Sequence, residues 1–312
     1  MKNKIKVGVV GVGKLGSYHI EKLKNNPKVD FIGIFDSNEH NMQEKGVRYK
    51  VSCFRNLDSL LCLCDAITVA TPTVTHFDIS KKALENNLHV FIEKPISNNL
   101  ANALKIKEIS DRMDRIVQVG HIERFNNAFI KSMEYIKKPQ FIEIHRISPF
   151  PERSLDIPVV MDIMIHDLDI ILSLNKNNPV VDIKAAGASI VTKFIDLANA
   201  RIEFQNGIVA NLTASRISSK QMRKIRIFQD NSYIGVDLLE KKIDFFEIDK
   251  NEGNAIKNKK IDFESTDALE DELNHFIDCI NKKQKPIVSA RDGIMALELG
   301  LEIEKLINNN TE

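Results

Sequence analysis

Four polar side chains recur at intervals of four, three and four residues in the largely apolar stretch from Val159 to Leu174. On a helix they form one stripe, which consists of Asp162, His166, Asp169 and Ser173. A carboxylate one turn before an imidazole can hold one ring nitrogen and leave the other to exchange a proton with a substrate hydroxyl. The same spacing also fits a purely structural interpretation, a helix-terminal aspartate followed by a histidine satisfied within the core.

A lysine that suits proton transfer follows the predicted apolar strand 89–92, in the sequence Glu93-Lys94-Pro95. Open α/β sheets bind ligands at the carboxyl ends of their strands, which is where Lys94 would stand. Taken alone, however, a lysine after a strand is usually a solvated surface charge.

A glycine-rich turn of the form GxGxxG lies between a predicted strand and a predicted helix, and its residues are Gly11, Gly13, Lys14, Leu15 and Gly16. Glycines permit the tight turn, the close approach of a pyrophosphate and the packing of helix on strand. The phosphates would then lie at the N-terminus of the helix, against unpaired N–H groups.

Asp36 ends the next predicted strand, twenty residues after Gly16. A carboxylate there accepts hydrogen bonds from the ribose hydroxyls of NAD and repels the 2′-phosphate of NADP. No arginine follows in Ser37-Asn38-Glu39, so the sequence predicts NAD as the cofactor. The alternative is a glycine-rich turn and a turn-forming aspartate without a ligand.

The first part of the chain alternates strands, predicted at 4–10, 31–35, 66–70, 89–92 and 116–119, with helices at 17–24, 76–87 and 100–113. This order indicates an α/β fold with a doubly wound parallel sheet, a Rossmann domain over residues 1–120.

Beyond Gly120 the predicted strands follow one another, at 141–147, 183–191, 198–204, 208–215 and 224–228. Such a series is typical of a mostly antiparallel open sheet. We therefore expect an α+β domain for substrate binding and oligomerisation over residues 121–312, with helices at 127–137, 159–174 and 290–307. Asn206-Gly207 predicts a hairpin turn, and the polar residues 250–260 predict a surface loop.

Composition favours a small-molecule partner over a polymer or a membrane. Lys and Arg (44) nearly balance Asp and Glu (43) in a chain of 312 residues, so no global field attracts nucleic acid or acidic lipid. No stretch is long and apolar enough for a membrane span or a signal segment. The four cysteines form no CxxC pair, so we expect no metal site and a reducing, cytoplasmic location.

Taken together, these motifs resemble the Gfo/Idh/MocA family of NAD(P)-dependent oxidoreductases. The likeness covers nearly the whole chain, and it rests on the glycine turn, Asp36, Ala70-Thr71-Pro72 with His76, the Glu93-Lys94-Pro95 motif, and the sequence from Asp162 to His166. By this resemblance, the acid/base positions are taken by Lys94, Asp162 and His166. The resemblance does not indicate which of them is the principal base. Thr71, Pro72, His76 and Glu93 line the cofactor side, and the open sheet face forms a homodimer or homotetramer interface.

A narrower likeness comes from two further segments, GHIERFN (120–126) and SPFPER (148–153), which precede the 159–174 stretch. They resemble the branch of the family that contains UDP-N-acetylglucosamine 3-dehydrogenases of lipid A assembly. This implies a sugar-nucleotide substrate that contacts Arg124, Asn126, Arg153, Asp162 and His166. Forked guanidinium donors suit a diphosphate, although surface arginines usually bind no ligand.

Two other functions fit the same sequence. A dehydrogenase of another sugar or cyclitol needs the same motifs, and only substrate trials distinguish it. A non-catalytic NAD-binding sensor needs the glycine turn but no proton relay, so Lys94, Asp162 and His166 together argue against it.

Overall fold

The computed structural model describes residues 4–150, 157–249 and 255–309, in two compact units. Unit 1 comprises Met1–His121 and Leu269–Leu297, and unit 2 comprises Ile122–Ala268 and Glu298–Glu312. Residues 269–297 thus pack with the N-terminal part of the chain.

Unit 1 contains a parallel sheet with the strand order β2-β1-β3-β4-β5. Its strands are β1 (Ile5–Val10), β2 (Val29–Phe35), β3 (Ala66–Val69), β4 (His89–Glu93) and β5 (Val117–Gly120). Its helices are α1 (Lys14–Lys24), α2 (Glu39–Tyr49), α3 (Leu57–Leu61), the 3₁₀ turn η1 (Thr73–Thr75), α4 (His76–Glu85), α5 (Leu100–Met113) and α8 (Ala268–Lys282). The predicted doubly wound parallel sheet is confirmed, but its unit also contains residues 269–297, which the predicted boundary near residue 120 assigned to the second domain.

Local sequence explains where several of these helices begin. Asn38, Asn56 and Asn99 precede α2, α3 and α5, and each side chain accepts a hydrogen bond from the N–H of the third helical residue. Helix α8 lies beside α1 in unit 1, because Phe276 packs edge-on against Phe91 of β4 and Lys22 pairs with Glu270.

Unit 2 contains an eight-stranded sheet in the order β13-β12-β11-β10-β6-β9-β8-β7. Its strands are β6 (Pro139–Ile147), β7 (Val180–Ala188), β8 (Leu197–Phe204), β9 (Val209–Ser215), β10 (Met222–Gln229), β11 (Ser232–Asp237), β12 (Lys242–Asp249) and β13 (Ala255–Ile261). Among the described strands, β6 and β9 run parallel and the other neighbours run antiparallel. The predicted α+β fold with a mostly antiparallel sheet is confirmed.

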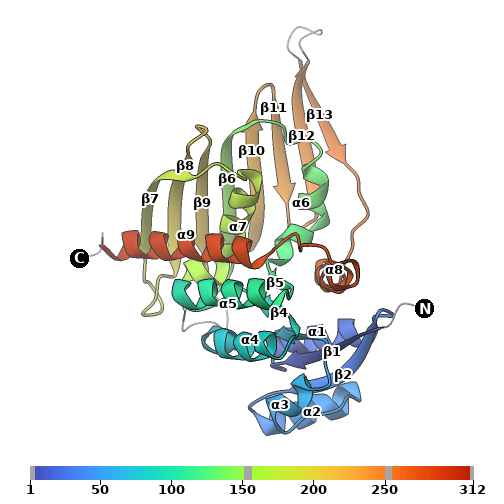
Figure 1. The fold of residues 1–312 in the computed structure, drawn as a ribbon. Coiled ribbons are helices and arrows are strands. Elements are labelled where there is room, and N and C mark those ends of the chain that lie inside the picture. Colours follow the sequence, from blue (N-terminus) through green and yellow to red (C-terminus); the bar gives the residue numbers. More distant parts are fainter. Residues whose placement is uncertain (1–3, 151–156, 250–254, 310–312) are drawn as a thin grey trace. The chain divides into compact units, whose positions relative to one another are not determined.

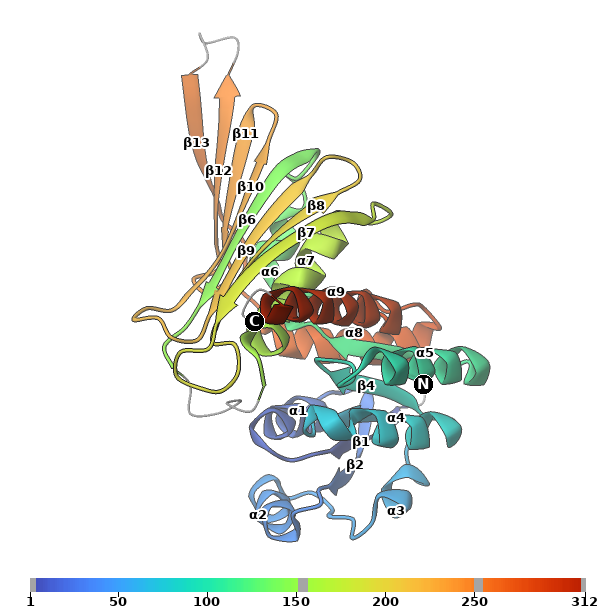
Figure 2. The same cartoon turned by 90° about the vertical axis from the view of Figure 1, so that its left-hand side faces the viewer.

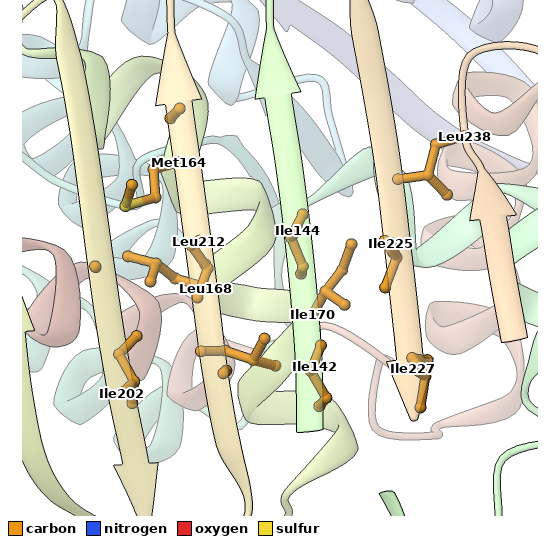
Figure 3. Close-up of a cluster of buried hydrophobic side chains, with 14 of the residues drawn as sticks. Ile142, Ile144, Met164, Leu168, Ile170, Ile202, Leu212, Ile225, Ile227 and Leu238 are labelled. Atoms are coloured by element: carbon orange, nitrogen blue, oxygen red, sulfur yellow. The ribbon is translucent and has the colours of Figure 1, made fainter. Parts of the chain in front are cut away.

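Helices cover one face of this sheet: α6 (Asn127–Ser132), α7 (Ile165–Leu174) and the C-terminal part of α9 (Ala290–Asn309) (Figure 1). Figure 2 shows no helix over the opposite face within the described residues. Alternate residues of the strands, such as Ile142, Ile144 and Ile225, pack against Leu168 and Ile170 of α7 (Figure 3). Their burial fixes α7 on the sheet.

The predicted helix over 127–137 ends at Ser132 as α6, and two further predictions for unit 2 differ from the structure. The segment 160–164 is a single π-helical turn, Val160–Met164, and the α-helix begins only at Ile165. An apolar sequence of this kind contains no signal that separates the two helix types. The second difference is that residues 255–261 form strand β13 rather than a loop. The predicted turn at Asn206-Gly207 is confirmed, since Gly207 has a φ of 84° between β8 and β9.

Candidate functional site

Two of the three glycines in the turn of unit 1 leave no room for a larger residue. Gly11 has a φ of 87°, and a Cβ there would lie 2.6 Å from the carbonyl oxygen of Ala70. A Cβ on Gly16 would lie 1.9 Å from the oxygen of Gly11. Gly13 instead borders open space, and no side chain caps the helix that starts at Lys14. The open space at Gly13 and the helix N-terminus without a side-chain cap therefore fit a pyrophosphate.

Asp36 is tied to this turn by its own hydrogen bonds. One carboxylate oxygen accepts from the N–H of Val12 at 2.8 Å, and the other accepts from the N–H of Asn38 at 2.8 Å. Each ionised oxygen has a further lone pair, so the carboxylate can still accept from ribose hydroxyls. The chemistry of this group fits the adenosine side of NAD.

His76 holds two predicted cofactor segments together. Its Nδ1 lies 2.8 Å from the carbonyl oxygen of Pro95, and its Nε2 lies 2.9 Å from that of Thr71, beside Pro72. Burial lowers the pKa of His76, although both carbonyls oppose this effect. A neutral imidazole carries one N–H, so it donates to one of the two carbonyls at a time. The buried ring thus supports the loops, and a direct cofactor contact from it stays a prediction.

Glu93 lies at the end of β4 and is only 7% exposed. Its carboxylate approaches Nε2 of His19 at 3.0 Å and accepts a 3.3 Å hydrogen bond from the backbone N–H of Lys94. Glu93 thus contacts the backbone of Lys94, in the same unit as the glycine turn and Asp36.

The other acid/base candidates belong to unit 2. Asp162 lies in the π-helical turn and His166 in the first turn of α7, and both side chains are partly buried. The side chains of the predicted stripe differ in exposure. Asp169 is only 2% exposed and pairs with Arg124 at 3.3 Å. Asp169 thus supports the helix, whereas Asp162 and His166 keep partial exposure.

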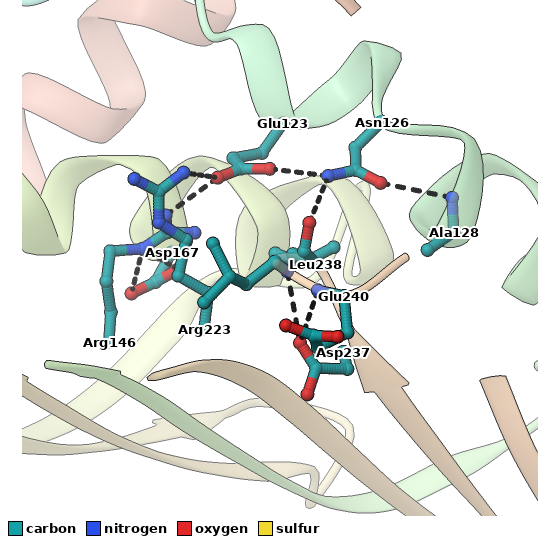
Figure 4. A network of polar contacts seen from close by, with 10 residues as sticks. Glu123, Asn126, Ala128, Arg146, Asp167, Arg223, Asp237, Leu238 and Glu240 are labelled. Carbon is teal, nitrogen blue, oxygen red and sulfur yellow. Dashed lines mark hydrogen bonds and ion pairs between the residues drawn. The ribbon is translucent and has the colours of Figure 1, made fainter. Parts of the chain in front are cut away.

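A buried ionic network holds α7 on the sheet (Figure 4). The guanidinium of Arg146 on β6 donates three hydrogen bonds of 2.7–3.0 Å to Asp167, the neighbour of His166, and one of 2.7 Å to Glu123. All three side chains are at most 6% exposed. Burial lowers the pKa of Arg146, but the two carboxylates outweigh it and raise that pKa overall.

This network was not predicted from the sequence, although the sequence contains a signal for it. Arg146 follows Ile142 and Ile144 at intervals of two residues, so it shares their buried face of β6. A charged residue on a buried face requires an opposite charge, and Asp167 supplies it.

The predicted substrate ligands have different surroundings. Asn126 caps α6 through the N–H of Ala128, and its amide donates to Glu123 and to the carbonyl of Leu238. These contacts give Asn126 a structural role, and its contact with a substrate stays a prediction. Arg153 lies outside the described residues.

Comparison with known proteins identifies the family. Residues 5–121 match the Gfo/Idh/MocA model described as an oxidoreductase family with an NAD-binding Rossmann fold, and residues 152–305 match the C-terminal α/β domain of the same family. The chain is a member of the Gfo/Idh/MocA oxidoreductase family.

Similarity extends over whole chains within this family. The chain is 32% identical over 309 residues to UDP-N-acetylglucosamine 3-dehydrogenase of Acidithiobacillus ferrooxidans, with 96% of both chains covered. A solved structure of that enzyme covers 98% of both chains, with a TM-score of 0.92 and 31% identity. Myo-inositol 2-dehydrogenase of Thermotoga maritima is 26% identical over 322 residues, with 96% of both chains covered.

The family membership makes this chain an oxidoreductase with a dinucleotide-binding domain. Within the described parts of the chain, no helix combines the length and apolarity that a membrane crossing requires. The same residues contain no cluster of three or more His, Cys, Asp or Glu side chains that is suited to a metal ion.

Proposed function

We propose that this enzyme oxidises the C3 hydroxyl of UDP-N-acetylglucosamine to a ketone, with NAD as the hydride acceptor. The observation that carries the proposal is the similarity over 96% of both chains to an enzyme named for this reaction. The shared fold, with a TM-score of 0.92, supports it. A 3-keto sugar nucleotide is the product that an aminating step of lipid A assembly would consume.

The cofactor would be held by Gly11, Gly13, Lys14, Leu15 and Gly16 around the phosphates and by Asp36 at the ribose. Bound NAD supplies the acceptor for the hydride that leaves the sugar carbon. The carboxylate of Asp36 supports NAD over NADP, because it would repel a 2′-phosphate. Comparable catalytic efficiencies with NADP and NAD would contradict this preference.

The proton of the oxidised hydroxyl needs an acceptor among the residues of the chain. His166 is one candidate base, with Asp162 one turn before it as the group that orients the imidazole. Lys94, after the buried Glu93, is the other candidate. These roles come from the family resemblance and from the exposure of the side chains within each unit.

The sugar nucleotide also carries a diphosphate, and Arg124 and Arg153 are our candidates to bind it. Arg124 is only 7% exposed and pairs with Asp169, but its guanidinium has five N–H groups, so donors remain for a second partner. Asn126 is the third substrate ligand that we propose.

The enzyme is proposed to work in the cytoplasm as a homodimer or homotetramer. The sheet face without helices carries a row of aromatic side chains in ring contact, formed by Phe141, Phe228, Tyr233 and Phe246. Phe228 is 39% exposed. Burial of this row against a second copy would be favourable, and analytical ultracentrifugation tests it.

A substrate screen tests the proposed reaction. Purified enzyme is mixed with NAD and equal concentrations of UDP-N-acetylglucosamine, UDP-glucose, myo-inositol or glucose, and the absorbance of reduced nicotinamide is followed. We expect reduction with UDP-N-acetylglucosamine, as a small burst that grows when a transaminase and an amino donor remove the ketone. Turnover of an unphosphorylated sugar or cyclitol, with none of any UDP-sugar, would refute the assignment.

A second candidate function is oxidation of a cyclitol. It is supported by the 26% identity to myo-inositol 2-dehydrogenase of Thermotoga maritima, which also extends over 96% of both chains. The lower identity places it second, and the myo-inositol arm of the same screen tests it.

A further inference from the structure

A buried histidine in unit 1 joins the two sequence motifs that the proposed function uses there. His19 lies on α1, the helix that begins at the glycine turn, and its side chain is fully buried. Its Nε2 lies 3.0 Å from Oε1 of Glu93, and its ring packs edge-on against Phe91 at 5.4 Å. His19 shares the buried face of α1 with Gly16 and Leu23. The sequence alone does not reveal that its partner is Glu93 on β4.

The hydrogen bonds of this pair can be assigned from chemistry. The other oxygen of Glu93 accepts the N–H of Lys94, as an ionised carboxylate does. Oε1 can therefore accept from Nε2 of His19, whose Nδ1 has no hydrogen-bond partner within the described residues. The ring is thus held by a single strong acceptor.

Space for this carboxylate is provided on the opposite side by a glycine. A Cβ on Gly120 would lie 2.8 Å from Oε2 and 3.1 Å from Oε1 of Glu93. The carboxylate is therefore confined between α1, the start of the Lys94 turn and the end of β5.

We propose that His19 is a positioning residue, which holds Glu93 so that the Lys94 turn stays in a fixed position relative to the helix that begins at the glycine turn. The inference rests on the proposed role of Lys94. A rigid link of this kind matters because small misplacement of a catalytic group lowers the rate far more than it lowers binding.

Two near-isosteric variants separate positioning from mere packing. His19→Gln places an amide donor where Nε2 stands, whereas the shorter His19→Asn leaves Glu93 without its donor. With UDP-N-acetylglucosamine and NAD, we expect the kcat of His19→Asn to fall about ten- to a hundredfold. We expect the Kd for NAD to change less than about threefold and His19→Gln to recover most of the kcat.

A folded His19→Asn enzyme with normal kcat would overturn the proposal, as would equal losses of kcat in both variants. If His19→Asn does not fold, Glu93→Gln takes its place. The glutamine has one acceptor oxygen and serves either His19 or Lys94, so its kcat should also fall; a normal kcat would overturn the proposal.

Crystal structures keep this test separate from that of the reaction. If the wild type turns over no UDP-sugar, the proposed function fails, but structures of wild type and His19→Asn with NAD still report the position of Lys94. We expect the carboxylate of Glu93 to turn away from the N–H of Lys94 in the variant, and an unchanged Lys94 turn would overturn the inference.

Discussion

The Lys94 turn in unit 1 and helix α7 in unit 2 are stabilised by different chemistry. Imidazoles support the first, with His19 on Glu93 and His76 between the carbonyls of Thr71 and Pro95. Guanidinium groups support helix α7, through the ion pairs of Arg146 with Asp167 and of Arg124 with Asp169. Arginine stays charged at every working pH, whereas burial lowers the pKa of His76 and so favours its neutral form.

This difference has a consequence for each unit. The support of α7 should be strong, because Arg146 stays charged at every working pH, although burial raises the pKa of its partner Asp167. Unit 1 should lose stability as the pH falls, since burial lowers the pKa of His76, so that the unfolded chain binds more protons than the native state does.

The largest expected effects concern the two candidate bases themselves. Lys94→Met and His166→Asn should each lose about a hundred- to ten-thousandfold in kcat, because a positioned proton-transfer group contributes that much. Binding of NAD, measured by calorimetry, should persist in both. Near-normal rates in both variants would contradict the proposed acid/base roles.

Breaking a buried ion pair in unit 2 should have the next largest effect, on the free energy of unfolding. Arg146→Met leaves Asp167 and Glu123 buried without their shared cation, which should cost about 3–5 kcal/mol of unfolding free energy. The matched control is Arg201→Met, which removes a partly exposed pair with Glu203 and should cost less than about 1 kcal/mol. Equal losses in denaturant titrations would show that burial does not govern the strength of these pairs.

Acid should destabilise unit 1 through His89. Burial, aided by Arg115, lowers the pKa of His89 to about 4, and its Nδ1 accepts the N–H of Ile116 at 2.9 Å. The unfolded chain titrates near 6.5, so between these values it binds more protons than the native state does. The free energy of unfolding should therefore fall as the pH drops from 6.5 to 4.

The variant His89→Asn tests this pH dependence, because its amide oxygen can replace Nδ1 as acceptor without titrating. We expect a shallower decline of stability below pH 6.5 and little change above it. The exposed His40→Asn serves as control and should keep the wild-type slope. An unaltered slope in His89→Asn would assign the acid sensitivity to other groups.

The smallest expected effect concerns Glu304 on α9 in unit 2. Burial raises its pKa to about 7, and its Oε1 has no hydrogen-bond partner among the described residues. Between 4.5 and 7 the native state binds more protons than the unfolded chain, so stability falls as the pH rises. Glu304→Gln should raise Tm by about 2–4 °C at pH 8 and leave it unchanged at pH 4.5. A stabilisation equal to that of the exposed control Glu302→Gln would contradict this explanation.

Much of the fold follows from short-range patterns in the sequence. Apolar runs between glycine, asparagine and proline predict β1 to β5, and Asn206-Gly207 predicts the β8–β9 hairpin. Strand β13 escapes prediction because its residues, including Lys257, Lys259 and Lys260, are exposed and lack apolar alternation. Its pairing with β12 defines it instead.

The residues of the candidate site could be predicted from the sequence, but the side-chain pairs that hold them in place could not. The glycine turn, Asp36, Lys94, Asp162 and His166 stand out by residue type and spacing. The supporting pairs nearby join distant parts of the chain: Glu93 is 74 residues from His19, and Asp169 is 45 residues from Arg124. Such pairings depend on tertiary packing, which local sequence patterns do not encode.

The central claim is that a hydride passes from C3 of UDP-N-acetylglucosamine to NAD, and isotope transfer tests it most directly. The enzyme is incubated with NAD and UDP-N-acetylglucosamine that carries deuterium at C3, and the reduced cofactor is analysed by mass spectrometry. We predict one deuterium on the reduced nicotinamide and a 3-keto sugar nucleotide in equal amount. Reduced cofactor without deuterium, or no reduction with a sugar nucleotide while an inositol is oxidised, would contradict the claim.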